Sequence, residues 1–172
     1  MLLRAYEPEG FPGRLRPGLE AEPWESVLDF GCGTGLWRNL FRSGRYVGLD
    51  QNEAMVAGAR QRWEGDNAEF VHCPGIADGD RTPFEDGAFD VVFMAAVLQH
   101  NSATDKAALL KEIRRILRPG GRLLMFENTF GDFNPGSEDG FSYTQEGWRN
   151  VIEPHGFACV RQERDFHIFR AV

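Results

Sequence analysis

The sequence lacks the apolar segments that membrane and secreted proteins carry. No uninterrupted apolar run approaches the ~20 residues that span a bilayer. The first ten residues, MLLRAYEPEG, hold only a short apolar run, and Arg4 interrupts it earlier than a charge would interrupt a secretory signal. These absences predict a cytoplasmic protein without a membrane partner.

Cysteine and positive charge are also scarce. The three cysteines, Cys32, Cys73 and Cys159, lie far apart without a C-x-x-C pair, so we expect free thiols in a reducing compartment. Lys and Arg number 19 against 26 Asp and Glu, which gives a formal net charge of −7. This acidic balance argues against nucleic-acid binding, because that binding requires cations that neutralise phosphates. The four histidines show no metal-ligand spacing, and no metal is expected.

Proline and glycine gather near the start of the chain, where they oppose regular structure. The sequence therefore predicts an irregular arm over residues 1–25 and a single domain over residues 26–172. A domain of this size can bury a sizeable core without disulfides. The sequence shows no internal repeat and no low-complexity segment.

The stretch SVLDFGCGTG is the most informative part of the sequence. An apolar run that contains Asp29 predicts a buried strand, and the alternating Gly31, Gly33 and Gly35 predict a tight turn at its end. Because glycine has no Cβ, a ligand can lie against this backbone; a turn without a ligand is the alternative. A helix is expected from Leu36, which stands where the G-x-G-x-x-G dinucleotide fingerprint has its third glycine. No G-x-x-x-x-G-K-[ST] phosphate loop occurs.

A second strand, expected over residues 45–50, ends in another carboxylate. Asp50 follows Asp29 by about twenty residues, the spacing that brings the end of a second strand beside the first turn in a βαβ unit. At that place a carboxylate can accept hydrogen bonds from both hydroxyls of a ribose. The alternative is that Asp50 caps the helix expected over residues 54–63, a task that Asn52 could share.

Five further apolar segments predict strands, and two amphipathic segments predict helices. The strands are expected over residues 69–73, 89–98, 122–127, 157–160 and 166–169, and the helices over residues 106–118 and 144–155. The nearly continuous apolar run of the second of these strands is typical of a central parallel strand. It places Gln99 and His100 at the same carboxyl edge of the sheet as Gly31 and Asp50.

Three segments resemble the class I S-adenosylmethionine-dependent methyltransferases. The glycine turn matches that family's first motif, an acidic residue followed by three alternating glycines. The run LRPGGRLL resembles the family's L-x-P-G-G-x-L turn, in which Pro119 and two glycines stop a helix before the next strand. The stretch that ends at Asp90 resembles the pattern D-A-x-x-L-P-F-x-D-x-x-F-D, although it is longer and carries Thr82 at the leucine position.

The resemblance implies an α/β fold with a doubly wound, mostly parallel seven-stranded sheet, helices on both faces and a C-terminal antiparallel strand. It also implies binding of S-adenosylmethionine and release of S-adenosylhomocysteine. Asp78 would contact the adenine amine, with Asp80 as the rival carboxylate. The implied cofactor-binding residues are Asp29, Gly31, Cys32, Gly33, Gly35, Asp50, Gln51, Ala77, Asp78 and Ala95.

For the reaction, the resemblance implies in-line methyl transfer to an oxygen, nitrogen or carbon nucleophile. His100 is the candidate base, because imidazole exchanges protons near neutral pH; a structural histidine bonded within its turn is the alternative. The long aromatic loop over residues 128–143 is expected to carry acceptor specificity. The candidate substrate-binding residues are Gln99, Asn128, Phe130 and Tyr143.

A small-molecule acceptor is expected, because the fourth strand is not followed by the N-P-P-[YF] tetrad of family members that methylate nitrogens of DNA or protein. The alternative function is a catalytically silent subunit of this fold that binds a protein partner. A dinucleotide-dependent oxidoreductase would require a substrate domain for which 172 residues leave no room. We expect a monomer or a homodimer.

Overall fold

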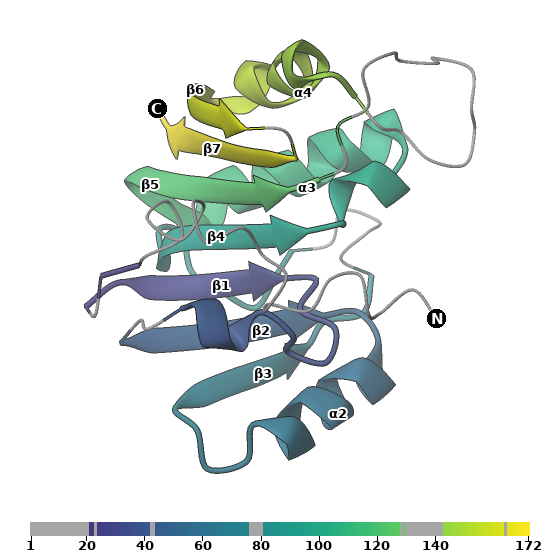
Figure 1. The fold of residues 1–172 in the computed structure, drawn as a ribbon, viewed down its shortest axis with the longest axis vertical. Helices are drawn as coiled ribbons and strands as arrows, with labels where there is room; N and C mark the ends of the chain where they lie inside the picture. The colour runs from purple at the N-terminus through teal and green to yellow at the C-terminus, as the bar shows by residue number, and fades with distance from the viewer. Residues whose placement is uncertain are drawn as a thin grey trace.

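The computed structural model describes residues 21–22, 24–41, 44–75, 81–127, 129, 143–163 and 165–172. They form a seven-stranded sheet of order β3-β2-β1-β4-β5-β7-β6, flanked by helices (Figure 1). The strands are β1 (Ser26–Phe30), β2 (Arg45–Asp50), β3 (Ala68–His72), β4 (Phe89–Ala95), β5 (Leu117–Phe126), β6 (Phe157–Glu163) and β7 (Phe166–Ala171). The α-helices are α2 (Glu53–Arg62), α3 (Ala103–Ile116) and α4 (Gln145–Ile152), and the 3-10 helices are η4 (Arg38–Leu40), η6 (Leu98–His100) and η7 (Glu153–His155).

Within the sheet, only β7 runs against its neighbours. β1 pairs in parallel with β2 and β4, β2 with β3 and β4 with β5, whereas β7 lies antiparallel between β5 and β6. The direction of winding reverses between β1 and β4. In an open α/β sheet this switch point, at the carboxyl ends of the strands, is where ligands bind. The predicted doubly wound fold is therefore confirmed.

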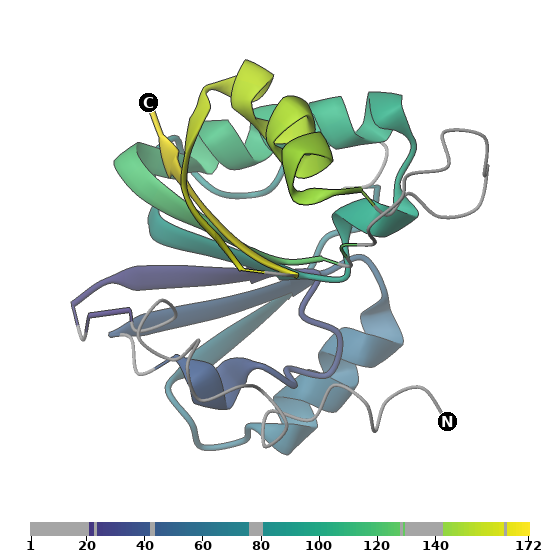
Figure 2. The ribbon, with the colours of Figure 1, turned by 45° about the horizontal axis from the view of Figure 1, so that its top comes forward.

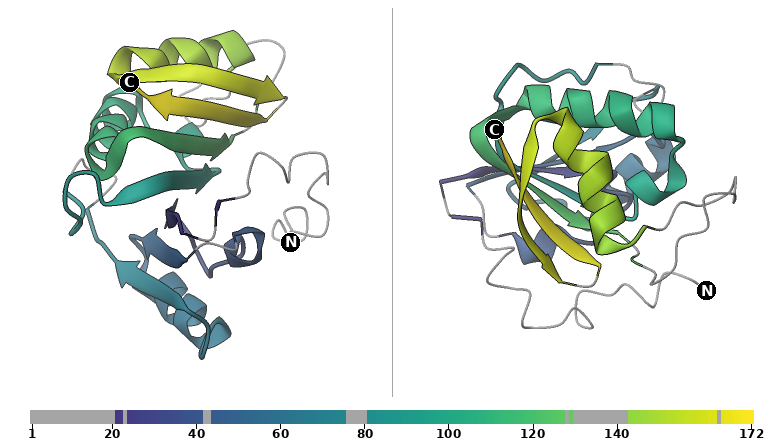
Figure 3. Two further views of the ribbon diagram at one scale, coloured as in Figure 1. Left: turned by 90° about the vertical axis from the view of Figure 1, so that its left-hand side faces the viewer. Right: turned by 90° about the horizontal axis from the view of Figure 1, so that it is seen from above.

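Helices cover both faces of the sheet. α3 and α4 lie on one face, and α2 and η4 lie on the other (Figures 2 and 3). β4 supplies side chains to both faces, because successive residues of a strand point to opposite sides. Val92 and Met94 join the apolar cluster on the α3 face, and Val91 and Phe93 join the cluster on the α2 face. This two-sided burial explains the continuous apolar run of β4.

The helix starts follow local capping rules. The side chain of Asn52 accepts hydrogen bonds from the amides of Ala54 and Met55 and so caps α2. Ser102 caps α3 by accepting from the amide of Asp105. Capping and apolar periodicity are both local in sequence, and the helices predicted over residues 54–63, 106–118 and 144–155 accordingly appear with shifted ends.

The helix expected from Leu36 is wrong. In the described residues between the glycine turn and β2, η4 is the only helical turn. Trp37 and Phe41 pack into the core instead, with ring centroids 5.8 Å and 5.2 Å from that of Phe93. Because β2 already begins at Arg45, this short connection is shaped by packing of its aromatic side chains rather than by helix propensity.

The sequence predicted that Pro119 and the two glycines after it would end a helix, but the structure places them elsewhere. α3 ends directly before Leu117, and β5 begins there, so that Pro119 and its glycines lie inside an irregular start of the strand. Phe89 of β4 pairs with Leu117, but Val91 already pairs with Arg122, which marks a bulge. The same residues that were expected to end a helix thus bend a strand.

The remaining expectations concern membrane-spanning helices, the cysteines and the N-terminal arm. No helix among the described residues is long and apolar enough to cross a membrane. All three cysteines are free, as expected, and two of them, Cys32 and Cys73, are buried. Residues 1–20 of the expected arm lie outside the described residues.

Candidate functional site

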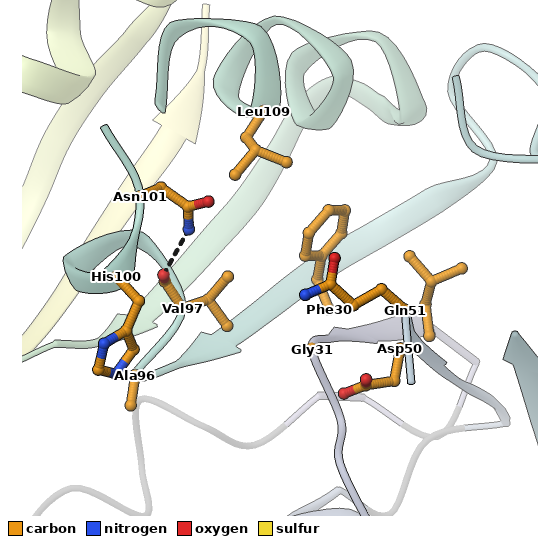
Figure 4. A pocket seen from close by; sticks show the side chains of 10 residues that line it. Phe30, Gly31, Asp50, Gln51, Ala96, Val97, His100, Asn101 and Leu109 are labelled. Carbon is orange, nitrogen blue, oxygen red and sulfur yellow. Dashed lines mark hydrogen bonds between the residues drawn. The ribbon is translucent and has the colours of Figure 1, made fainter. Parts of the chain in front are cut away.

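A cavity of about 370 Å³ opens at the switch point between β1 and β4 (Figure 4). The carboxyl ends of β1 and β2 form one wall, and the segment that follows β4 forms the other. The residues lining this switch-point cavity are Phe30, Gly31, Leu49, Asp50, Gln51, Ala96, Val97, His100, Asn101 and Leu109. Its volume lies within the ~300–1,000 Å³ range of small-molecule sites.

The glycine turn brings backbone to the cavity. The amides of Gly31 and Cys32 donate to the carbonyl of Leu49, at 2.8 and 3.0 Å, which ties the turn to β2. A Cβ on Gly31 would lie 2.6 Å from Val97 Cγ2, so a larger residue would clash with the opposite wall. Gly33 has φ +53°, and no atom lies within 4 Å of the place that its Cβ would occupy. A ligand can therefore approach this backbone closely.

Asp50 presents its carboxylate at the cavity wall. Its Oδ2 accepts a hydrogen bond from the Gly33 amide at 2.8 Å, and its Oδ1 accepts one from the Asn52 amide at 2.9 Å. Asn52 performs the capping of α2, so the alternative role that the sequence left open for Asp50 falls to its neighbour. Asp50 is held in place by backbone donors and faces the cavity (Figure 4).

Asp29 lies in the core below the turn and does not line the cavity. It is fully buried, and its Oδ2 accepts a 2.5 Å hydrogen bond from the Tyr46 hydroxyl. Oδ1 has no hydrogen-bond partner among the described residues. Burial raises the pKa of Asp29 from 3.8 to about 7, the Tyr46 hydrogen bond lowers it, and the nearby charge of Asp50 adds to the rise.

The other described residues of the predicted cofactor set have different surroundings. Cys32 is 3% exposed, and burial raises the pKa of its thiol. The carbonyl of Gly35 accepts a hydrogen bond from Trp63 Nε1 at 2.9 Å. Ala95 is the half-buried last residue of β4, and Gln51 is exposed at the cavity rim. Of these, Gln51 alone lines the cavity.

The strand β4 ends at Ala95 and not at Leu98 as expected, because Ala96 turns the chain with a φ of +55° that non-glycine residues rarely adopt. η6 follows at once. His100, its last residue, is exposed and lines the cavity. Gln99 is buried, and its Nε2 lies 3.2 Å from His100 Nε2. This geometry suits both roles that the sequence left open for the histidine.

The predicted acceptor loop contributes little to the described structure. Tyr143 is half-buried, with its ring centroid 4.8 Å from that of Trp148 and 5.4 Å from Lys106 Nζ. It does not line the switch-point cavity. Four predicted residues lie outside the described residues: Ala77, Asp78, Asn128 and Phe130.

Several residues of the site were missed from sequence. Val97 and Asn101 lie on the wall, and Leu109 reaches the cavity from α3. Their side chains carry no motif, and only the fold brings them to the switch point. Glu127 lies behind the wall, 1% exposed, directly after β5. A carboxylate at the end of an otherwise apolar strand was a visible signal for it.

The site combines an apolar slot with a carboxylate at one end. Phe30, Val97 and Leu109 can hold a flat aromatic group, and Asp50 can accept hydrogen bonds from a diol. His100 lies at the cavity rim, where it could exchange a proton with a second ligand. This is the chemistry of a nucleoside site that is open to a reaction partner.

Known sequences match this chain over its central part. The sequence profile of the family described as "Methyltransferase domain" matches residues 28–125, more than half of the 172-residue chain. The demethylmenaquinone methyltransferase of Lactococcus lactis subsp. lactis is 37% identical over 112 residues, which cover 60% of this chain and 42% of that protein. The ubiquinone/menaquinone biosynthesis C-methyltransferase UbiE of Hahella chejuensis is 41% identical over 111 residues, which cover 59% and 42%. The chain thus spans less than half the length of these relatives.

Solved structures share the fold. The 1,6-didemethyltoxoflavin-N1-methyltransferase of Burkholderia thailandensis, solved with 1,6-didemethyltoxoflavin and S-adenosylhomocysteine, superimposes with a TM-score of 0.76 at 21% identity, covering 99% of this chain and 81% of that one. A SAM-dependent methyltransferase of Methanosarcina mazei superimposes with a TM-score of 0.72 at 17% identity, and the match covers 88% of this chain and 94% of that one. At these identities the likeness concerns the fold alone. With the profile match over the strands that build the cavity, it follows that the chain belongs to the class I S-adenosylmethionine-dependent methyltransferase family.

Proposed function

We propose that this domain binds S-adenosylmethionine in the switch-point cavity and transfers its methyl group to a small-molecule acceptor. One observation carries the proposal: the backbone of the glycine turn at Gly31, the Asp50 carboxylate and the apolar side chains of Phe30, Val97 and Leu109 line a single cavity. Family membership supports the same cofactor. When bound, S-adenosylmethionine supplies a methyl group that is activated by its positive sulfur.

The residues present fit this cofactor. Asp50 would accept hydrogen bonds from the ribose hydroxyls, because each of its oxygens keeps a lone pair beyond the one used by a backbone amide. Phe30, Val97 and Leu109 would hold the adenine ring and exclude water from it. The bare backbone at Gly33 would let the cofactor pass close to the turn. Asp78 remains our candidate for contact with the adenine amine.

The protein's part in the reaction would be mainly to orient the reactants. No acid is needed, because the departing thioether is neutral. Holding the acceptor atom, the methyl carbon and the sulfur in line can lower the barrier by several kcal/mol. His100, at the cavity rim beside Gln99, would take a proton from acceptors that must lose one.

The names of similar proteins support a small-molecule acceptor. Two relatives are named for demethylmenaquinone and for ubiquinone/menaquinone biosynthesis, and a structural neighbour was solved with 1,6-didemethyltoxoflavin. Those names include both a C-methyltransferase and an N1-methyltransferase. The acceptor panel for this chain should therefore contain hydroquinones, phenols and heteroaromatic nitrogen compounds.

The test is calorimetry with S-adenosylhomocysteine, followed by methyl transfer from labelled S-adenosylmethionine to that panel. We expect saturable binding of the nucleoside and label transfer to at least one acceptor class. His100→Ala should retain the affinity for S-adenosylhomocysteine and lower turnover by about 100-fold or more on acceptors that must lose a proton. Binding without any transfer, together with tight association with a protein partner, would favour the silent subunit. Absence of binding would refute the proposed function.

A further inference from the structure

Glu127 lies behind the cavity wall and holds it through the backbone. Its carboxylate accepts three hydrogen bonds from successive amides of the segment after β4. Val97 and Leu98 donate to Oε1 at 2.8 and 2.9 Å, and Gln99 donates to Oε2 at 3.1 Å. These amides lie at the start of η6, where backbone N–H groups have no partner within the helix, and Glu127 supplies one to each of them.

Lys106 holds the other end of the same segment. Its side chain is 2% exposed on α3, and its ammonium donates to the carbonyl of Asn101. Asn101 in turn donates from Nδ2 to the carbonyl of Val97 at 2.7 Å, which closes the segment on itself (Figure 4). A carboxylate therefore binds the amides at the start of residues 97–101, and an ammonium binds a carbonyl at their end.

Burial of both groups opposes their charged forms. It raises the pKa of Glu127 to about 7 and lowers the pKa of Lys106. Buried ionic groups of this kind add little net stability compared with apolar residues of similar volume. Their effect is instead to favour one arrangement of the backbone that they contact. The contacted backbone carries three of the cavity-lining residues, Val97, His100 and Asn101.

We propose that Glu127 and Lys106 are positioning residues that hold residues 97–101 in the shape of the cavity wall, and that affinity for the adenosyl group depends on this hold. Neither side chain lines the cavity, so neither is a catalytic residue. The identity of the ligand rests on the proposed function. The hold itself is a property of the protein alone and can be measured without a ligand.

Charged and titratable groups reach Glu127 from α3 and from the start of β7. The cation of Lys106 lowers the pKa of Glu127 and opposes the effect of burial. Asp165 accepts the backbone N–H of Glu127 through its carbonyl at 2.9 Å. Thr129 Oγ1 donates to the Glu127 carbonyl and lies 3.2 Å from Nε2 of His167, whose pKa burial lowers to about 4. His167 is therefore neutral between pH 6 and pH 8, and its charge does not change in that range.

A pH profile separates positioning from a general structural role. Below about pH 7 Glu127 takes up a proton and loses part of its capacity to accept three N–H bonds. We expect the affinity of the wild type for S-adenosylhomocysteine to fall up to about tenfold from pH 8 to pH 6 through this group. In Glu127→Gln, residue 127 cannot take up a proton, so this part of the fall in affinity should be absent. The other titratable groups near the cavity are the same in both proteins, so the difference between the two pH profiles reports on Glu127.

The experiment compares Glu127→Gln and Lys106→Met with the control Glu25→Gln. Glu25 is also a buried carboxylate, but it precedes β1 and so lies at the end of that strand away from the cavity. Amide hydrogen exchange is measured without ligand, and affinity for S-adenosylhomocysteine is measured by calorimetry. In Glu127→Gln we expect about tenfold faster exchange at residues 97–99, unchanged exchange in β1 and at least about tenfold weaker binding. Lys106→Met should weaken binding in the same direction. Glu25→Gln should change neither readout.

Two failures can be told apart. Wild-type exchange and wild-type affinity in both Glu127→Gln and Lys106→Met would overturn this inference and leave the proposed function intact. If the wild type does not bind S-adenosylhomocysteine, the proposed function fails, and with it the link to adenosyl affinity. In that case exchange at residues 97–99 still decides whether Glu127 holds the segment.

Discussion

At the scale of single residues, two carboxylates near the same turn have different surroundings. Asp50 is half-buried, is bonded to backbone amides and faces the switch-point cavity. Asp29 is fully buried and bonded to Tyr46. A carboxylate that lines a cavity can bind a ligand directly, whereas one in the core influences the turn through packing and charge. We therefore propose ligand contact for Asp50 and expect Asp29 to affect stability.

Asp50→Asn should weaken binding of S-adenosylhomocysteine by about 10- to 100-fold. The amide keeps one oxygen for the Gly33 amide but removes the charge that strengthens hydrogen bonds from ribose hydroxyls. Calorimetry at constant ionic strength measures the change. Glu64→Gln removes an exposed carboxylate outside the cavity lining and should leave the affinity unchanged. Equal affinity of Asp50→Asn and wild type would remove Asp50 from the site.

Tyr46→Phe should cost more stability at high pH than at low pH. Burial raises the pKa of Asp29 to about 7 in the folded protein, whereas an unfolded Asp titrates near its ordinary value of 3.8. The free energy of unfolding therefore falls as the pH rises from about 4 to 7, because the folded protein must then bury an ionised carboxylate. The Tyr46 hydroxyl limits that loss by donating to the ionised form. Its removal should cost about 1 kcal/mol at pH 5 and about 2–3 kcal/mol at pH 8.5, measured by urea unfolding.

The control for this prediction is Tyr46→Phe in an Asp29→Asn background. Residue 29 cannot titrate there, so the cost of losing the hydroxyl should be the same at both pH values. If the cost is also independent of pH in the wild-type background, Asp29 does not ionise in the folded protein over this range.

At the scale of elements, aromatic side chains from neighbouring segments pack against the glycine turn and the connection that follows it. Trp63, which follows α2, packs against the turn and donates from Nε1 to the Gly35 carbonyl at 2.9 Å. Trp37 and Phe41 anchor the connection to β2 in the core. The turn therefore depends on aromatic packing as well as on its own glycines.

Gly35→Ala tests this packing. Gly35 has φ +71°, and its Cβ would lie 2.6 Å from Trp63 Nε1, so the substitution adds a clash to the backbone strain. Gly65→Ala is the matched control, because Gly65 has φ +86° and open space at its Cβ. We expect Gly65→Ala to lower the free energy of unfolding, measured with denaturant, by about 1 kcal/mol. Gly35→Ala should lower it by roughly 1–3 kcal/mol more, because the clash with Trp63 adds to the strain. Equal costs would show that Trp63 moves away freely.

At the scale of the whole molecule, the sheet order creates the cavity. β1 and β4 are neighbours in space, but their connections lead to opposite sides of the sheet. The segments that follow these two paired strands therefore diverge, and a ligand can enter between them. Apolar clusters on both faces hold the strands in this order.

Ligand binding at such a site should stabilise the whole domain. S-adenosylhomocysteine at about 100 times its Kd should add about 2.7 kcal/mol and raise Tm by roughly 5–10 °C in thermal unfolding. NADH at the same concentration should leave Tm unchanged, because the turn departs from the dinucleotide fingerprint at Leu36. An equal shift with both ligands, or none with S-adenosylhomocysteine, would contradict the proposed specificity.

Features that depend on local sequence were predictable. The apolar run of β4, the alternating glycines after β1 and the position of Asp50 all follow from residues that are neighbours in sequence or separated by one βαβ unit. The predicted strands, and every predicted helix except the one expected from Leu36, accordingly appear in the structure. The length of η4 and the bulge in β5 were not predictable, because side-chain packing and strand pairing decide them.

By itself the sequence determined the fold class, the glycine turn and the placement of Asp50, because apolar periodicity and backbone freedom are properties of short segments. Only the tertiary structure decided which carboxylate faces the cavity and what holds its far wall. The hydrogen bonds that the amides of Val97, Leu98 and Gln99 donate to Glu127 join residues 28–30 positions apart, in the segments that follow two neighbouring strands. Such contacts arise when the sheet forms, and no local pattern records them.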